Sequence, residues 1–248
     1  YSSASRYRPL RRGAGSLPFQ GESMPMTAET PPLVLDIDGT LTDGSGRLDP
    51  RIFEYLPAWD ALVVLATGKA FPYPVALCHF LGIEQTVIAE NGGVVLADGA
   101  VSYQGDPERA ADAAADFGER GGDLGWEGFD TVNTWRETEL AARTTADLDL
   151  LRSVAAGFDL EVFDTGYAYH LKTPGVEKGA GLRAVADALD LDPKAFVAVG
   201  DSVNDVSMFE VAGRSFAVAN ADVDARSAAD TVVEESYFTG TASVLDSL

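Results

Sequence analysis

The feature that most constrains the fold of this chain is a series of short apolar runs, each followed by Gly, Thr or acidic residues. We expect strands at residues 33–36, 62–66, 86–89, 195–199, 215–218 and 231–233, and helices at 75–81, 178–189, 203–211 and 242–248. Apolar runs of this length are typical of buried parallel strands. The alternation predicts an α/β fold with a doubly wound, mainly parallel, Rossmann-like sheet that binds ligands at the carboxyl ends of its strands.

The middle of the chain, residues 96–173, has a different pattern. Helices are expected at 106–118 and 146–156, and strands at 137–144, 160–164 and 167–172. Two helices with antiparallel strands predict a small α+β module inserted into the core. We therefore expect a core domain made of residues 26–95 and 174–248, and an inserted domain of residues 96–173.

The first 25 residues are unlike the rest, because they are rich in Arg and Ser and contain a single acid, Glu22. A signal peptide needs an apolar stretch of about 7–15 residues after its basic part, and this segment has none. We expect residues 1–25 to be a disordered extension, with Met24 or Met26 as the true start.

The charge balance excludes several partners. The chain has 18 basic and 39 acidic residues in 248, a net charge of −21, which repels nucleic acid and anionic membranes. No apolar run approaches the roughly 18 residues that a membrane span needs. The single cysteine, Cys78, excludes an internal disulfide and a Cys-rich zinc site. With 24 Asp and only four Lys, the composition resembles that of proteins from salt-saturated cytoplasm, so we expect a cytoplasmic protein of a halophile.

Two carboxylates follow the first strand directly, in the segment Asp36-Ile37-Asp38-Gly39-Thr40. Side chains two residues apart at a strand end can converge on one cation, and a hard cation such as Mg²⁺ takes one or two protein carboxylates while leaving room for a phosphate. An ordinary turn with Asx-type hydrogen bonds is the alternative for an isolated Asp-x-Asp-Gly.

Further polar residues follow other predicted strands or open helices. Thr67 follows the second strand, Lys178 opens a helix, and Asp201, Asn204 and Asp205 follow the strand 195–199. Each has a plain structural interpretation, since Thr67 could belong to a turn, Lys178 to a solvated helix face, and Asp201 to a helix cap. Their joint occurrence at strand ends favours one active site.

These segments resemble the four motifs of the haloacid dehalogenase superfamily of phosphohydrolases. LVLDIDGTLTD matches the first, LVVLATGK the second, EKG the third and VAVGDSVNDVSMF the fourth, in the right order. The insert lies between the second and third motifs, as does the C2-type cap of the Cof-like (type IIB) branch. Together with ATGK, IAENGG and EKG, this makes the chain similar to archaeal, especially haloarchaeal, phosphoglycolate phosphatases.

The resemblance implies a role for each motif residue. Asp36 would attack phosphorus and form an aspartyl-phosphate, and Asp38 would protonate the leaving group and then activate water. Thr67, Lys178 and Asn204 would bind the phosphoryl group or the substrate. Mg²⁺ would be held by Asp36, Asp38 through its carbonyl, Asp201 and Asp205.

The expected reaction is the Mg²⁺-dependent hydrolysis of 2-phosphoglycolate, a small phosphorylated metabolite, by a monomer or homodimer. Sugar phosphates or mannosyl-3-phosphoglycerate are alternative substrates within the same branch. A phospho-accepting receiver is a different class, but it is about half as long and carries no insert. A non-catalytic binding protein on this fold is the third alternative.

Three residues of the insert carry weaker hypotheses. Arg136 and Arg143 are the cations that could bind a glycolate carboxylate, because Arg offers a bidentate fork. We expect His170, on a predicted strand of the insert, to have a packing role.

Overall fold

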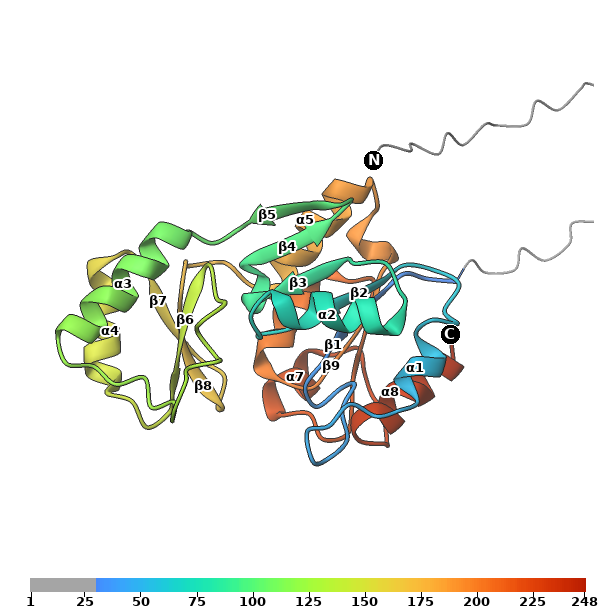
Figure 1. Cartoon of the computed structure of the whole chain (residues 1–248). Coiled ribbons are helices and arrows are strands. Elements are labelled where there is room, and N and C mark those ends of the chain that lie inside the picture. Colours follow the sequence, from blue (N-terminus) through green and yellow to red (C-terminus); the bar gives the residue numbers. More distant parts are fainter. Residues whose placement is uncertain (1–29) are drawn as a thin grey trace, which may run out of the picture.

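An eight-stranded sheet forms the centre of the larger part of the molecule in the computed structural model, which describes residues 30–248 (Figure 1). The strands are β1 (Leu33–Asp36), β2 (Val63–Ala66), β3 (Val87–Ala89), β4 (Val94–Ala97), β5 (Ala100–Tyr103), β9 (Val197–Gly200), β10 (Arg214–Ala217) and β11 (Thr231–Val232). Their order is β11-β10-β9-β1-β2-β3-β4-β5, and all neighbours from β11 to β3 are parallel. The extension predicted for residues 1–25 lies outside the described residues.

Helices cover both faces of this sheet because successive side chains of each strand point to opposite sides. In β1, Leu33 and Leu35 join one apolar core while Val34 joins the other. The first core includes side chains of α1 (Ile52–Tyr55), α2 (Pro72–Leu81) and α8 (Tyr237–Asp246). The second includes side chains of α5 (Lys178–Leu189), α6 (Val206–Val211) and α7 (Val223–Ala228). The predicted doubly wound α/β fold is confirmed.

The parallel order ends at β3, which the sequence analysis did not anticipate. β3, β4 and β5 form an antiparallel meander at one edge of the large sheet. The sequence analysis assigned residues from 96 onward to the insert, but β5 pairs with β4 along its whole length. Every residue of β5 is exposed, so it has no buried apolar run by which to recognise it.

Two predicted helices have different bounds in the structure. The helix expected at 203–211 is split into a short 3₁₀ turn, Val203–Asp205, and α6, because the Asp205 carboxylate accepts hydrogen bonds from the N–H groups of Asp201 and Ser202 and tightens the first turn. The last helix, α8, begins at Tyr237 rather than at 242. Its first residues include Thr and Gly, which are weak helix formers, and the buried Phe238 anchors them.

The inserted segment forms a separate three-stranded antiparallel sheet with two helices on its outer face (Figure 1). Its elements are α3 (Pro107–Glu119), β6 (Glu139–Arg143), α4 (Leu148–Gly157), β7 (Glu161–Asp164) and β8 (Ala168–Lys172), with strand order β6-β8-β7. Leu140 and Leu171 pack against the helices, so by alternation Glu139 and His170 lie on the other face. The predicted α+β character of the insert is confirmed. Among the described residues, no helix is long and apolar enough to cross a membrane.

Candidate active site

The polar residues predicted from the motifs meet where parallel strands of the large sheet end. Asp36 ends β1, Thr67 follows β2 and Asp201 follows β9, and these three strands are adjacent. A cleft of about 480 Å³ lies at the ends of these strands. Its lining includes Asp36, Asp38, Gly68, Lys69, Asp201 and Asn204, together with Val132, Arg136, Thr165 and Tyr167 of the inserted segment. Both parts of the molecule therefore contribute to one site.

A second cavity, of about 630 Å³, lies between the small sheet and helices α6 and α7. It is lined by residues such as Phe163, Lys172, Ser207 and Asp224. Asp36 and Asp201 do not border it, so the cleft at the strand ends is the candidate active site.

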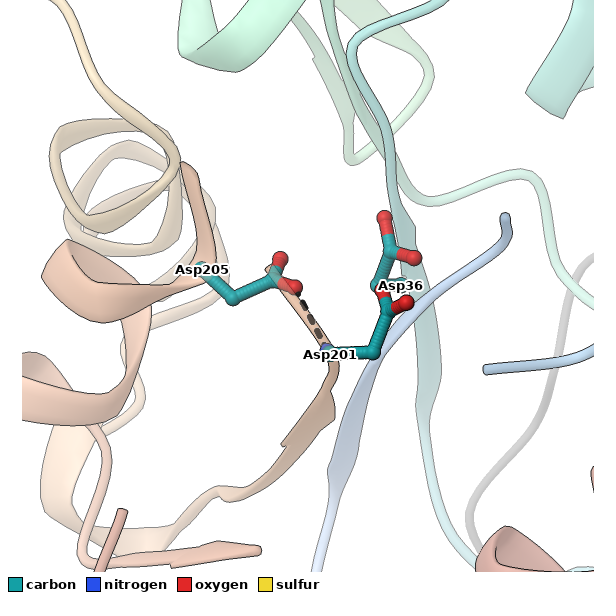
Figure 2. Close-up of side chains that lie close together, drawn as sticks. All are labelled: Asp36, Asp201 and Asp205. Carbon is teal, nitrogen blue, oxygen red and sulfur yellow. Dashed lines mark hydrogen bonds between the residues drawn. The ribbon is translucent and has the colours of Figure 1, made fainter. Parts of the chain in front are cut away.

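We use the name acidic centre for Asp36, Lys178, Asp201 and Asp205. Carboxylate oxygens of the three Asp residues lie within 4.8 Å of one another (Figure 2). The Lys178 Nζ lies 2.6 Å from Asp36 Oδ1 and 2.6 Å from Asp205 Oδ1, and its side chain is fully buried. Asp205 Oδ2 accepts hydrogen bonds from the N–H groups of Asp201 and Ser202, at 2.9 and 3.1 Å. The ammonium thus holds two of the three carboxylates in place.

Burial and neighbouring charges shift the pKa values of the ionisable groups in the acidic centre. Burial raises the pKa of Asp36, an effect that Lys178 opposes and the Asp205 charge reinforces. Burial, reinforced by the Asp205 charge, raises the pKa of Asp201 to about 7. Burial alone would lower the pKa of Lys178, but the charges of Asp205 and Asp36 raise it above its usual value. Lys178 therefore stays cationic at neutral pH.

The acidic centre has the properties of a cation site. When all its groups are ionised, three carboxylates and one ammonium give a net charge of −2. Asp201 Oδ1 is buried and has no hydrogen-bond partner within residues 30–248, which is costly unless a ligand satisfies it. Oxygen donors and a net charge of −2 fit a hard divalent cation such as Mg²⁺.

Gly39 allows the chain to approach Asp201 closely. Its φ is +84°, and a Cβ at this position would lie 1.9 Å from Asp201 Oδ2. Only glycine therefore fits between the end of β1 and the Asp201 carboxylate.

Asp38 lies apart from the acidic centre. Its side chain is 52% exposed, borders the cleft and pairs with Lys69, with 3.0 Å between Lys69 Nζ and Asp38 Oδ2. Thr67 is buried, and its Oγ1 accepts a hydrogen bond from the Lys69 N–H, which leaves the hydroxyl hydrogen available to donate. The carboxylate of Asp38 thus faces the substrate space and not the other Asp side chains.

Asn204 borders the cleft, and its amide also joins the fourth motif to Asn91, which follows β3. Its Nδ2 donates to Asn91 Oδ1 at 2.9 Å, and its Oδ1 accepts from the Ser202 hydroxyl at 2.6 Å. The substrate-binding role expected for Asn204 stays a prediction.

Asn220 is a residue of the site that the sequence analysis missed. Its Nδ2 donates to Gly39 O at 3.1 Å and to Asp201 Oδ2 at 3.2 Å, and its Oδ1 accepts from the Tyr237 N–H. It thereby fixes the orientation of the Asp201 carboxylate. The sequence did contain a signal for Asn220, because it follows closely after the apolar run 215–218. Asp36 and Asp201 were identified by the same position at the end of an expected strand.

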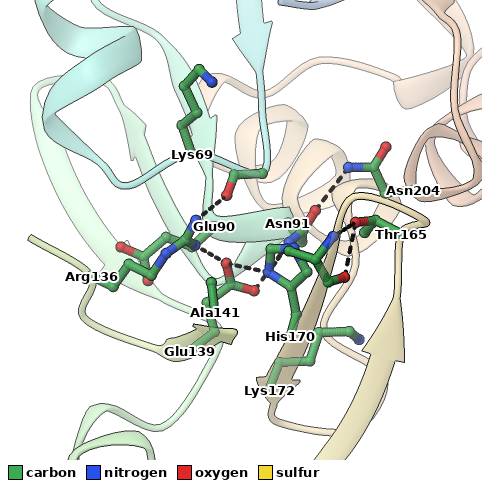
Figure 3. Close-up of polar contacts among 12 residues, drawn as sticks. Lys69, Glu90, Asn91, Arg136, Glu139, Ala141, Thr165, His170, Lys172 and Asn204 are labelled. Carbon is green, nitrogen blue, oxygen red and sulfur yellow. Dashed lines mark hydrogen bonds and ion pairs between the residues drawn. The ribbon is translucent and has the colours of Figure 1, made fainter. Parts of the chain in front are cut away.

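A second buried polar cluster joins the inserted segment to the large sheet, and we name it the junction cluster: Asn91, Arg136, Glu139 and His170 (Figure 3). Glu139 accepts from Arg136 and from Asn91 Nδ2 at 3.0 Å, and its Oε1 lies 3.0 Å from His170 Nδ1. Burial would raise the pKa of Glu139, but His170 and Arg136 lower it to about 2. Glu139 is therefore a buried carboxylate with several partners.

The junction cluster also clarifies the weaker hypotheses about the insert. His170 is buried in a structural contact with Glu139, which is consistent with the packing role expected for it. Arg136 borders the cleft and donates from Nη2 to Gly68 O at 2.9 Å. Arg143 instead stacks over the Trp126 ring, 5.5 Å from its centroid, and does not border the cleft.

Comparisons with known proteins agree with this geometry. The family model of haloacid dehalogenase-like hydrolases matches residues 33–128 and 157–245. Proteins named phosphoglycolate phosphatase from Halorubrum lacusprofundi and Natronomonas pharaonis are 65% and 52% identical, over 88% and 87% of this chain and 97% and 96% of theirs. A crystal structure from Thermoplasma acidophilum has a TM-score of 0.74 at 26% identity and covers 87% of this chain and 96% of that one. The chain therefore belongs to the haloacid dehalogenase-like hydrolase family.

Proposed function

We propose that this protein is a phosphomonoesterase that hydrolyses 2-phosphoglycolate to glycolate and phosphate. The observation that carries the proposal is the acidic centre at the bottom of a cleft, in a chain 65% identical to a protein named phosphoglycolate phosphatase. Phosphate monoesters hydrolyse extremely slowly in water, so a catalyst must place a nucleophile in line and neutralise the phosphoryl oxygens. The acidic centre supplies both the nucleophile and the charged groups.

Asp36 is the proposed nucleophile. Its Oδ1 is held by Lys178, so Oδ2 is the oxygen that attacks phosphorus, forming a P–O bond as the bond from phosphorus to the ester oxygen breaks. The product of this step is an aspartyl-phosphate, and the leaving alkoxide takes a proton from Asp38. Asp38 suits this role because its carboxyl group borders the cleft, where the glycolate end of the substrate lies.

Hydrolysis of the intermediate reverses the proton transfer. Asp38, now ionised, takes a proton from water, whose oxygen attacks phosphorus and displaces the Asp36 carboxylate. Lys69 Nζ lies 3.0 Å from Asp38 Oδ2, so the two side chains are paired at the cleft. Asp36 and the protonated Asp38 are thereby restored, with inorganic phosphate as the second product.

The phosphoryl oxygens are bound by Thr67 and Lys178. The Thr67 hydroxyl retains a hydrogen to donate, and the Lys178 ammonium supplies a compact positive charge beside Asp36. Mg²⁺, when bound by Asp36, the Asp38 carbonyl and Asp201, would neutralise further phosphoryl charge. Asp205 orients Lys178 and the loop from Asp201, and Asn220 orients Asp201. Asn204 supports the site through Asn91.

We also infer a division into a core of residues 30–105 and 174–248 and a cap of residues 106–173. The pairing of β5 with β4 supports a boundary later than residue 96. The cap contributes Val132, Arg136, Thr165 and Tyr167 to the lining of the cleft, so substrate binding involves both parts of the molecule. A cytoplasmic location and a monomeric or homodimeric state stay predictions.

The test is phosphate release in molar KCl with Mg²⁺, comparing 2-phosphoglycolate with sugar phosphates, phosphoglycerates and mannosyl-3-phosphoglycerate. We expect kcat/KM for 2-phosphoglycolate to exceed the others by at least about tenfold and to be abolished by EDTA and by Asp36→Asn. Asp60→Asn, at an exposed position, is the matched control and should keep full activity. If phosphate were released equally well from sugar phosphates, the proposed reaction would stand, but 2-phosphoglycolate would be rejected as the preferred substrate. No release from any ester would reject the enzyme and favour a phospho-accepting or binding protein.

A further inference from the structure

The cleft has few cations with which to bind an anionic substrate. Of the residues within 30–248 that border it, only Lys69 and Arg136 carry a positive charge. A substrate such as 2-phosphoglycolate has a carboxylate joined to the ester oxygen through a single carbon. Once the phosphate lies at the acidic centre, its carboxylate must reach one of these two side chains or remain unpaired in the cleft, which is costly.

Lys69 is the weaker candidate for this contact. Its Nζ is already 3.0 Å from Asp38 Oδ2, and both side chains are about half exposed, at 44% and 52%. An exposed lysine is a flexible point charge that salt screens strongly, and it has no fixed geometry for a carboxylate. Its charge is paired with Asp38, and the proposed mechanism puts Asp38 beside the ester oxygen.

Arg136 is held rigidly at the edge of the cleft. Its side chain is 6% exposed, and three of its five N–H bonds have partners: Nε donates to Val132 O at 3.0 Å, Nη2 to Gly68 O at 2.9 Å, and Nη1 to Glu139. Within residues 30–248 one N–H on each of Nη1 and Nη2 is left without a partner. Glu139 approaches from the cap and Gly68 from the core, so both parts of the molecule fix the guanidinium.

The contact with Gly68 also sets how far Arg136 lies from the reaction. Gly68 directly follows Thr67, the proposed phosphoryl ligand, so the guanidinium lies beside the phosphate end of the cleft and not at its mouth. A carboxylate attached through a single carbon to the ester oxygen would be within reach, whereas that of a longer ester would extend past it.

We propose that Arg136 binds the carboxylate of the substrate and thereby selects short, carboxylated phosphomonoesters. This inference rests on the proposed function, since it specifies how that substrate is recognised. Glu139 is then a positioning residue, because it accepts from Arg136 while His170 and Asn91 hold its own carboxylate. A rigid guanidinium binds a carboxylate with little loss of side-chain entropy, which favours affinity.

The test compares 2-phosphoglycolate with ethyl phosphate, which has the same number of carbons and no carboxylate. For Arg136→Gln we expect kcat/KM on 2-phosphoglycolate to fall by about 100-fold, mainly through a higher KM, because a ground-state contact is lost. The loss on ethyl phosphate should be at least about tenfold smaller. Arg136→Lys should lie between wild type and Arg136→Gln, since it keeps the charge and loses the fork.

Arg136→Gln leaves Glu139 buried without its cationic partner, so a second variant guards against misfolding. Arg136→Gln/Glu139→Gln replaces the ion pair by two neutral amides, and its loss should again be selective for the carboxylated substrate. Arg143→Gln is the matched control, because that arginine belongs to the cap but stacks on Trp126 outside the cleft. It should leave both activities at the wild-type level.

Several outcomes would overturn the proposal. Equal losses on both substrates would mean that Arg136 only joins the cap to the core. A loss selective for 2-phosphoglycolate in Lys69→Gln but not in Arg136→Gln would assign the carboxylate to Lys69. Ethyl phosphate hydrolysed by the wild type as well as 2-phosphoglycolate would show that the carboxylate is not recognised. If the wild type hydrolysed neither ester, the proposed function itself would fail, which the phosphate assay on the unmodified protein reveals before any variant is made.

Discussion

The acidic centre and the junction cluster are both buried, polar and built around carboxylates, yet they differ in completeness. In the acidic centre, three Asp residues lie together, but the one ammonium pairs only with Asp36 and Asp205, and Asp201 Oδ1 has no partner in the described structure. In the junction cluster, one carboxylate, Glu139, is matched by Arg136, His170 and Asn91. The first is therefore short of positive charge, whereas the second is satisfied by the chain itself.

The pKa values of the two clusters express the same difference. Burial raises the pKa of Asp36 and Asp201, whereas Glu139, which is just as buried as Asp36, has its pKa lowered to about 2 by His170 and Arg136. A buried carboxylate is stable in its ionised form when the favourable interactions with its partners exceed its desolvation cost. When they do not, the carboxylate favours the binding of a cation. The acidic centre is therefore arranged for a ligand, and the junction cluster for holding the cap.

The largest effect should come from removing the single cation of the acidic centre. Lys178→Met leaves Asp36 and Asp205 buried without their shared partner, so we expect stability to fall by about 3–5 kcal/mol and activity by at least about 10³-fold. Urea unfolding and phosphate release measure both.

The matched control is the other buried lysine, Lys172. Its Nζ donates to Val176 O and to Glu161, whose side chain is 41% exposed and can be solvated when the lysine is removed. Lys172→Met should cost about 1 kcal/mol, and activity should stay within about threefold of wild type. Equal costs for the two variants would show that Asp36 and Asp205 do not depend on Lys178.

The acidic centre was largely predictable from sequence, and the junction cluster was not. Asp36, Thr67 and Asp201 each follow an apolar run, and parallel strands bring their carboxyl ends to one edge, so local patterns determine that these residues meet. Glu139 and His170 lie on antiparallel strands of the cap, and their approach to Asn91 depends on how the cap docks on the core. No local pattern in the sequence encodes that docking.

The same reasoning explains the errors in the fold. β5 was missed because it is exposed along its length, and the start of α8 was missed because its Thr and Gly residues are weak helix formers. Both elements are stabilised by tertiary contacts: β5 by pairing with β4, and α8 by the burial of Phe238. Asn220 was overlooked for another reason, since an amide at a strand end is a weaker sequence signal than a carboxylate.

The second prediction tests the junction cluster through pH. The folded-state pKa of Glu139, about 2, is below its usual value of 4.5, so its contribution to stability is full above pH 4.5 and is lost as the pH falls toward 2. The contribution is on the order of 3 kcal/mol. Glu139→Gln should therefore lower stability at pH 6 and do so progressively less below pH 4.5, as measured by urea unfolding.

Glu137→Gln is the control for that experiment, because this neighbouring carboxylate is exposed. Glu137→Gln should change the free energy of unfolding by less than about 0.5 kcal/mol at both pH 6 and pH 3. If the cost of Glu139→Gln were the same at pH 6 and pH 3, the carboxylate would not be the stabilising form, and the contrast with the acidic centre would be wrong.

The acidic centre is short of positive charge, so the third prediction concerns its binding of Mg²⁺. A cation that binds only the folded protein, at a concentration 100 times its Kd, adds about 2.7 kcal/mol to stability. Mg²⁺ should raise the Tm of the wild type accordingly. The increase in Tm should be much smaller in Asp201→Asn, which loses the carboxylate whose Oδ1 has no hydrogen-bond partner in the described structure. Glu139→Gln should keep the full increment. An unchanged increment in Asp201→Asn would place the cation elsewhere.

The smallest effect should come from a single side-chain hydrogen bond between the cap and the core. The Thr138 hydroxyl donates to Glu90 Oε2 at 2.8 Å, and the N–H groups of Glu137 and Thr138 donate to the same carboxylate. Thr138→Val keeps the shape packed against Gly93 and Gly105 and removes one donor, so we expect a loss of about 1 kcal/mol with activity within about threefold of wild type. Thr144→Val, at an exposed position of the cap, should change stability by less than about 0.5 kcal/mol. A tenfold loss of activity in Thr138→Val would mean that cap docking governs the chemistry, and the two clusters would then act as one unit.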